Sequence, residues 1–400
     1  MWTIPLSELD YDTREEQAVQ AVLSSRWLSM GPQTEAFERE FAQAHGAPHA
    51  VALQSGTAAL YLALRALGIG AGDEVVLPAL TFVASAHAVM QCGAVPVLAD
   101  VSSARRPLLD PADAARRIGP RTRALLPVHY GGALCDMPAL RALADQHELL
   151  LIEDAAHAAG APGVGQLSDA ACFSFYANKN LATGEGGMLL TARDELASRC
   201  RALRSHGRST SSHDKASGHT ARDDVTLHGV NARMTEVQAA LGRVQLGKLA
   251  AGNARRRDLR RLYMRALGAS LEIPLAGDEE ASACHLMVVL LPTGCDREVV
   301  RTALATDGIQ TSVHYPPIHQ LSAFADARPP RPVLSVTEAL APRLLSLPLH
   351  ARLSDADAQR VADALLAALT AESPSERPRA SSGAHPAKRS GNTPNARPSP

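Results

Sequence analysis

The chain has 400 residues, of which 46% are hydrophobic, and Lys plus Arg (40) nearly balance Asp plus Glu (41). Such a chain can bury one large core or two ordinary ones, and a net charge of -1 offers no electrostatic footprint for nucleic acid or an anionic membrane. The six cysteines form no CxxC pair, which is typical of reduced core thiols. The N-terminus lacks a secretory pattern and no apolar run is long enough to span a bilayer, so we expect a cytoplasmic protein.

Strand and helix patterns alternate along the first 250 residues. A capping box at residues 13–16 predicts a helix through Val22, and an Ala- and Leu-rich pattern predicts another over 55–67. Short apolar runs bounded by turn residues predict buried strands at 50–53, 74–77, 95–98, 124–128, 149–152, 172–175 and 188–191. Buried strands separated by helices predict an α/β fold with a mostly parallel sheet covered on both faces.

The composition changes twice toward the C-terminus. Apolar residues at helical spacing predict an amphipathic helix over 234–249, and the apolar run 284–291 begins a second, smaller α/β unit. From residue 371 the chain is rich in Pro, Ser and Arg and has no aromatic residue, a composition that does not bury a core. We therefore expect a large domain over 1–250, a small C-terminal α/β domain over 251–370 and a disordered tail over 371–400.

Lys179 stands in an unusual place for a lysine. It follows the apolar run 171–175 and precedes the glycine-rich turn 184–187. Near a protein interior the ammonium form is disfavoured, so the amine becomes a usable nucleophile for Schiff-base chemistry. A lysine that merely extends from a loop to solvent explains this stretch alone equally well.

Other predicted strands end in groups that could bind a ligand together with Lys179. Ligands of such sheets bind beyond the carboxyl ends of the strands. Residues 55–57 open a helix and predict an anion site, Phe82 can stack on a flat ligand, and Asp154 can hold a protonated ring nitrogen. Each has an ordinary alternative as a helix cap or core residue. Together with Ser174 and Lys179, they provide in chain order what pyridoxal phosphate (PLP) requires.

In these features the chain resembles the DegT/StrS-type sugar aminotransferase family of fold-type-I PLP enzymes. The resemblance extends from about Trp27 to Leu369 and is carried by the runs 55–60, 72–76, 153–158, 174–187, 231–238 and 313–319. It implies a large, mostly parallel sheet domain with a smaller C-terminal α/β domain. Relatives that act as dehydratases have histidine in place of the lysine, so Lys179 favours transamination.

The family pattern also implies the roles of individual residues. Lys179 and Asp154 would be catalytic: Lys179 forms the Schiff base with PLP, and Asp154 pairs with the ring nitrogen. Phe82 would stack on the ring and His157 would lie near the ring hydroxyl. The other implied residues are Gly56, Thr57 and Ser174 at the phosphate, Asn231 at the phosphate of the neighbouring subunit in a homodimer, and Tyr315, His319 and Arg233 on the substrate side.

The expected reaction is amino transfer, from glutamate, to a keto sugar linked to a nucleoside diphosphate. Residues 205–233 and 314–324 are expected to line the substrate pocket, and the first segment carries charge that suits a diphosphate: His206, Arg208, His213, Lys215, His219, Arg222 and Arg233. A solvated polar loop is the alternative for that segment. A keto cyclitol substrate and a non-catalytic PLP-binding regulator are the alternatives for the function. The histidines lack zinc-site spacing, so no metal is expected.

Overall fold

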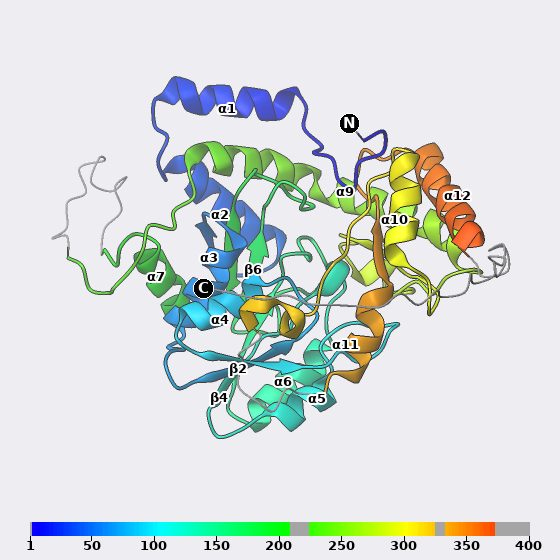
Figure 1. Ribbon diagram of the computed structural model, residues 1–400. Coiled ribbons are helices and arrows are strands. Elements are labelled where there is room, and N and C mark those ends of the chain that lie inside the picture. The colour runs from blue at the N-terminus through cyan, green and yellow to red at the C-terminus, as the bar shows by residue number, and fades with distance from the viewer. Residues whose placement is uncertain (1, 209–223, 325–332, 373–400) are drawn as a thin grey trace, which may run out of the picture.

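The computed structural model describes residues 2–208, 224–324 and 333–372, and in these ranges the α/β architecture predicted from the sequence is confirmed (Figure 1). Most of the charged substrate segment, including His213, Lys215, His219 and Arg222, lies outside the described residues, as does the tail from residue 373 onward. None of the helices in the described ranges combines the length and apolar character that a membrane crossing requires.

Seven strands form the main sheet in the order β1-β7-β6-β5-β4-β2-β3. Neighbours from β3 to β6 in this order are parallel, whereas β7 is antiparallel to both β1 and β6. The strands are β1 (His49–Leu53), β2 (Glu74–Pro78), β3 (Val95–Ala99), β4 (Thr122–Leu125), β5 (Leu150–Asp154), β6 (Ala170–Ser174) and β7 (Gly187–Thr191). Because β5 and β6 are parallel neighbours, Asp154 and Ser174 both stand at the carboxyl edge of the sheet.

Both faces of this sheet are buried, since successive strand side chains point to opposite sides. Val75 and Leu77 of β2 belong to one core cluster with α3, α4 and α7, whereas Val76 belongs to the opposite cluster with α5 and α6. The aromatic side chains of α2 pack on β6 and β7 together with α9. The covering helices are α2 (Pro32–Ala44), α3 (Gly56–Ala66), α4 (Ala84–Gln91), α5 (Pro111–Arg117), α6 (Met137–Gln146), α7 (Asp194–Leu203) and α9 (Glu236–Leu267).

The helix α9 continues from the large sheet into a second α/β unit (Figure 1). There Leu259 and Tyr263 of α9 pack against a two-stranded antiparallel sheet and its helices. The elements of this unit are β8 (Met287–Leu290), β9 (Leu344–Leu347), α10 (Arg297–Thr306) and α12 (Asp355–Glu372), and α11 (Ser335–Leu340) precedes β9. Residue 250 thus falls inside one continuous helix, and the division into domains at that residue stays a prediction.

The helix α1 (Thr13–Ser25) lies along α9 (Figure 1). Its capping box forms one residue earlier than predicted: Asp12 is the N-cap and accepts the Arg14 N–H at 2.9 Å, while Glu15 accepts the Asp12 N–H at 2.8 Å. Glu15 takes this role because it is the third residue after the N-cap Asp12. Its carboxylate is also buried against Lys248 of α9, whereas Glu16 faces solvent.

Candidate active site

A cavity of about 410 Å³ opens at the carboxyl edge of the main sheet, a size ordinary for a small-molecule site. Its wall includes eight residues predicted from the sequence: Gly56, Thr57, Phe82, Asp154, His157, Ser174, Lys179 and Tyr315. Four strand ends and the loop before α11 therefore meet around one space, although their residues are spread over 260 positions of the chain.

The start of α3 forms a cradle for an anion on one side of this cavity. The Ser55 side chain caps the Ala58 N–H at 3.1 Å, and the N–H groups of Gly56 and Thr57 belong to the first turn, which has no intrahelical acceptors. A Cβ atom on Gly56 would lie 2.8 Å from the Ser174 Cβ, so only glycine lets β6 approach the helix end so closely. This geometry suits a phosphate group.

Lys179 lies in the loop between β6 and β7 and extends into the same cavity. Among the described residues, its Nζ has no hydrogen-bonding or ion-pair partner. Burial lowers the pKa of Lys179 from its usual 10.5 to about 8, although the negative charge of Asp154 acts in the opposite direction. An amine with this pKa has a substantial neutral fraction near neutral pH, as a nucleophile requires.

We expect this lowered pKa to appear in the chemical reactivity of Lys179. Only the neutral amine reacts with trinitrobenzenesulfonate, so in cofactor-free protein the modification of Lys179 should rise through a midpoint near pH 8. Asp154→Asn should lower that midpoint further, because the charge that raises the pKa is removed. Peptide mapping by mass spectrometry follows the modification of Lys179 alone. A midpoint near the usual 10.5 would contradict the lowered pKa.

Asp154 ends β5 and has both carboxylate oxygens held. Oδ1 accepts the Ala156 N–H at 3.1 Å, and Oδ2 accepts the hydroxyl of Ser85 at 2.6 Å. The backbone of Asp154 is anchored as well, by Pro127 O and by the His129 N–H. Phe82, which precedes α4, is 54% exposed at the rim of the cavity, and its ring centroid lies 5.6 Å from that of Tyr315.

His157 and Tyr315 form a hydrogen-bonded pair whose direction follows from the surroundings. Burial and the nearby charges of Lys179 and His314 lower the pKa of His157 well below its usual value, so its ring is neutral. Its Nδ1 accepts the Gly131 N–H at 3.3 Å, which places the ring proton on Nε2, 3.0 Å from the Tyr315 hydroxyl. Nε2 therefore donates to Tyr315. Burial also raises the pKa of Tyr315, so its own proton remains available to an acceptor in the cavity.

Three of the predicted site residues are not in the cavity wall. Asn231 is exposed and pairs through its backbone with Ser205, and Arg233 lies two residues further along the same segment. His319 is close to Glu338, with 3.4 Å between Nε2 and Oε1. The roles predicted for these residues, like those of the cavity residues, stay predictions.

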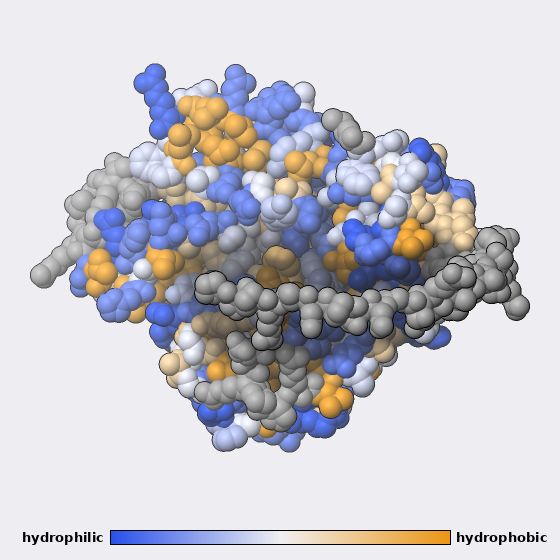
Figure 2. Space-filling model, in the orientation of Figure 1, coloured by the Kyte–Doolittle hydropathy of each residue, from blue (hydrophilic) through white to orange (hydrophobic). Residues whose placement is uncertain are grey.

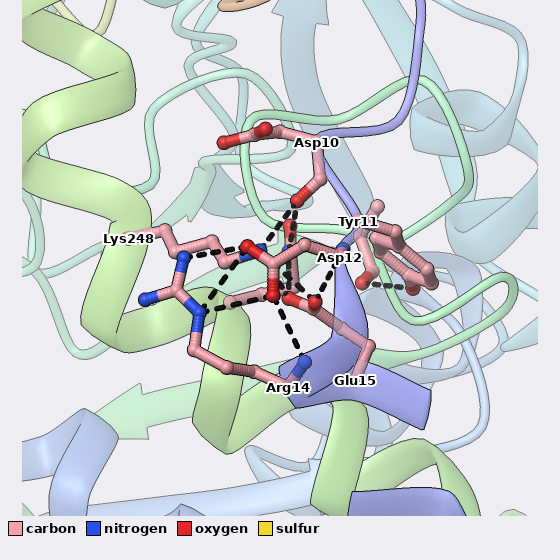
Figure 3. Close-up of polar contacts among 8 residues, drawn as sticks. Asp10, Tyr11, Asp12, Arg14, Glu15 and Lys248 are labelled. Atoms are coloured by element: carbon pink, nitrogen blue, oxygen red, sulfur yellow. Dashed lines mark hydrogen bonds and ion pairs between the residues drawn. The ribbon is translucent and has the colours of Figure 1, made fainter. Parts of the chain in front are cut away.

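An ionic cluster ties the N-terminal segment to α9 and to the lysine loop. Figure 3 shows Lys248 reaching toward Asp10, Asp12 and Glu15, with ion pairs of 3.0 Å to Asp12 and 2.7 Å to Glu15. Burial alone would raise the pKa of Glu15, but hydrogen bonds from Lys248 and its neighbours outweigh burial and lower it. Tyr11 donates to Ala182 O at 2.8 Å, three residues beyond Lys179. The N-terminal segment thus supports the loop that carries the lysine.

Several groups around the cavity were not predicted from the sequence. Ser85 contacts Asp154, and His285 packs against His157 with its ring tilted by 39° and 4.4 Å between ring centroids. Ser85 follows Thr81 by one helical turn, and that hydroxyl pair beside a predicted aromatic residue was an available signal. His285 had no local signal, because only the packing of the loop before β8 against His157 gives it a place at the site. The cavity wall also includes polar residues that were not predicted: Thr81, Tyr176, Asn178, Glu185 and His314.

A lysine with a lowered pKa, a carboxylate, an anion cradle and an aromatic ring at the carboxyl edge of such a sheet define a PLP-type enzyme site. Comparison with known proteins gives the family. The chain belongs to the DegT/DnrJ/EryC1/StrS aminotransferase family, whose pattern matches residues 10–366. The family and the enzyme class predicted from the sequence are therefore confirmed: the protein is an aminotransferase.

Individual relatives cover most of the chain. It is 40% identical over 368 residues to the spore coat polysaccharide biosynthesis protein SpsC of Bacillus subtilis (strain 168), covering 88% of this chain and 93% of SpsC. DesV of S. venezuelae, solved with a ketimine intermediate, has a TM-score of 0.82 and 39% identity and covers 89% of this chain and 94% of its own. DesI, solved in the presence of its TDP-sugar product, has a TM-score of 0.82 and 32% identity, with coverages of 93% and 94%. Solved relatives with cofactor include the PMP and PLP forms of the putative sugar aminotransferase Spr1654 of Streptococcus pneumoniae and NtdA of Bacillus subtilis with bound PMP.

Proposed function

We propose that this protein transfers an amino group from glutamate to a keto sugar linked to a nucleoside diphosphate. The coarser function, a PLP-dependent aminotransferase acting on a sugar, follows from the family and its sugar aminotransferase members. The observation that carries the proposal is the position of Lys179, an amine with a pKa of about 8, in one cavity with Asp154 and the anion cradle of α3.

The residues of the cavity fit PLP group by group. The first-turn N–H groups of α3 and Ser174 would hold its phosphate, and Asp154 would accept a hydrogen bond from its ring nitrogen. Phe82 would cover the ring, and His157 would lie near the ring hydroxyl. When bound, PLP supplies an electron sink for the carbon that gains or loses the amino group.

Lys179 has two tasks in this arrangement. Its neutral Nζ would hold the cofactor covalently between turnovers, and the same nitrogen, once released, would carry a proton from the substrate carbon to the C4′ carbon of PLP, and back in the second half of the reaction. The Tyr315 hydroxyl, with its proton directed away from His157, would donate a hydrogen bond to substrate. Phe82 and Tyr315 would also shield the reacting atoms from water on the open side of the cavity.

The nucleotide part of the substrate is supported by the relatives and by charge. DesI is described with a TDP-sugar product, and residues 205–233 are rich in basic side chains. Within the described cavity wall, Lys179 is the one Lys or Arg side chain, so a diphosphate would meet its counter-charges on segments such as 205–233. A keto cyclitol, the alternative, needs no such charges.

We also propose that the enzyme is a homodimer in which Asn231 reaches the phosphate site of the partner. Asn231 is exposed and lies outside the cavity of its own chain. Large apolar side chains are exposed as well, among them Leu23 of α1 and Leu28; Figure 2 shows an apolar patch over the position of α1. A cytoplasmic location stays a prediction of the sequence.

A two-stage absorbance experiment tests the reaction. Glutamate alone should convert the visible spectrum of the PLP-loaded enzyme to that of the pyridoxamine form. A TDP-linked keto sugar should then restore the first spectrum with a kcat/KM at least about tenfold above that of the same sugar without nucleotide, the effect of roughly one charged contact. Mass spectrometry identifies the aminated product.

Two outcomes would contradict the proposal. Faster restoration by a keto cyclitol than by any nucleotide-linked sugar would assign the alternative substrate class. No spectral change with glutamate, but a change with another amino acid, would overturn the donor while leaving the aminotransferase in place.

A further inference from the structure

Two buried hydroxyl groups form a continuous chain with Asp154: Ser85 stands outside the cavity wall, whereas Thr81 belongs to it. Ser85, in the first turn of α4, is 0% exposed, and Thr81, four residues earlier, is 1% exposed. The Ser85 Oγ lies 2.6 Å from Asp154 Oδ2 and 2.9 Å from Thr81 Oγ1. Strand β5 supplies the carboxylate and the segment after β2 supplies both hydroxyls, so the chain links two parts of the sheet edge.

The direction of the protons along this chain follows from the number of donors. Ser85 has one hydroxyl proton and three oxygen neighbours: Asp154 Oδ2, Thr81 Oγ1 and, at 3.3 Å, Phe82 O. The ionised acceptor at the shortest distance takes that proton, because charge-assisted hydrogen bonds are the stronger ones. Thr81 must then be the donor in its contact with Ser85. The chain runs from Thr81 through Ser85 to Asp154, and each bond polarises the next.

The consequence for Asp154 is a carboxylate fixed in rotation. Ala156 N–H holds Oδ1 and Ser85 holds Oδ2, so rotation about the last side-chain bond breaks at least one of these contacts. Asp154 also lines the cavity, so its remaining lone pairs are available to a ligand there.

The same segment carries Phe82, between Thr81 and Ser85. The ring that covers one face of the cavity and the carboxylate at its end are therefore positioned by one hydrogen-bonded unit.

We propose that Ser85, supported by Thr81, is a positioning residue of this aminotransferase that orients the Asp154 carboxylate toward the cofactor ring and holds it in register with Phe82. The inference rests on the proposed function, in which Asp154 accepts a hydrogen bond from the ring nitrogen of PLP. Ser85 does not line the cavity, so it acts through Asp154 and its own segment and not by contact with the cofactor.

The test compares PLP binding and kinetics in Ser85→Ala with a matched control. In Ser85→Ala we expect the affinity of cofactor-free protein for PLP, measured by absorbance titration, to fall about tenfold, as for the loss of a hydrogen bond to a charged group. The kcat of the loaded enzyme should fall by a similar factor, with KM for the amino donor changed less than about twofold. Thr81→Val should also lower PLP affinity and kcat, but by a smaller factor. Thr81→Ser, which keeps the hydroxyl, should have close to native PLP affinity and kcat.

Thr34→Val is the matched control, because Thr34 also donates a buried hydroxyl to a carboxylate, Glu236, at 2.7 Å but stands outside the cavity wall. It should lower the melting temperature as Ser85→Ala does, with unchanged PLP affinity. If Thr34→Val weakens PLP binding equally, Ser85 acts only through stability and the proposal is overturned. If Ser85→Ala does not fold, Thr81→Val decides: unaltered affinity in that variant overturns the proposal.

Asp154→Asn separates the failure of this inference from that of the proposed function. If Asp154→Asn weakens PLP binding and Ser85→Ala does not, only the positioning role is wrong. If neither variant weakens binding, the role of Asp154 itself is wrong, and the inference fails with it.

Discussion

Replacing Lys179 with alanine is expected to abolish amino transfer. The variant loses the nitrogen that would hold PLP and the base that would move the proton, and general acid–base catalysis alone contributes roughly 10²- to 10⁴-fold. We therefore expect kcat to fall by about 10⁴-fold or more, together with the visible absorbance of the lysine-bound cofactor. The fold should persist, because Nζ has no partner among the described residues. Full activity in Lys179→Ala would sink the site assignment.

The same variant provides a control for shared active sites. Asn231→Ala should have low activity as a homodimer, because each site lacks the asparagine of the partner. Mixed dimers of Lys179→Ala and Asn231→Ala chains contain one site with both native residues. If the chains pair at random, about a quarter of the native activity should return, and purified mixed dimers should have about half. No recovery after refolding the mixture would argue against the contribution of Asn231 to the partner site.

Asp154→Asn is the second change with a large expected effect. Asparagine keeps the size of the side chain but carries no charge. It would therefore no longer stabilise the protonated ring nitrogen that electron withdrawal requires. Loss of one such preorganised electrostatic contact costs on the order of 10²- to 10³-fold in kcat. Stopped-flow measurement of the glutamate half-reaction reports this step directly, without the sugar.

Asp100 offers the comparison for Asp154. It also follows a parallel strand, β3, and its carboxylate accepts the N–H groups of Val336 and Thr337 at 2.9 Å, but it does not line the cavity. Asp100→Asn should lower stability while leaving the rate of the half-reaction within about threefold. Equal rate losses in both variants would mean that carboxylates at this edge act on the fold rather than on the chemistry.

The sheet strands and the central lysine were predictable because their signals are local. Apolar runs such as 172–175 and 188–191 are bounded by turn residues, and in the structure they are β6 and β7. The direction of β7 was not predictable, since antiparallel and parallel strands bury the same kind of side chain when both faces are covered. The exact cap of α1 was missed although its signal is local: Asp12 and Glu15 have the spacing of a capping box, and Asp is preferred to Thr at the N-cap.

Local sequence was enough to predict the kinds of chemical group at the site: an amine after one strand, a carboxylate after another and a helix start with small residues. These follow from residue type and from position relative to a strand, both of which are written locally. Only the tertiary structure decided how those groups are tuned. Burial lowers the pKa of Lys179, Gly131 sets the proton position on His157, and Ser85 fixes Asp154. Each of these effects depends on contacts between distant segments, because desolvation and hydrogen-bond direction are properties of the packed interior.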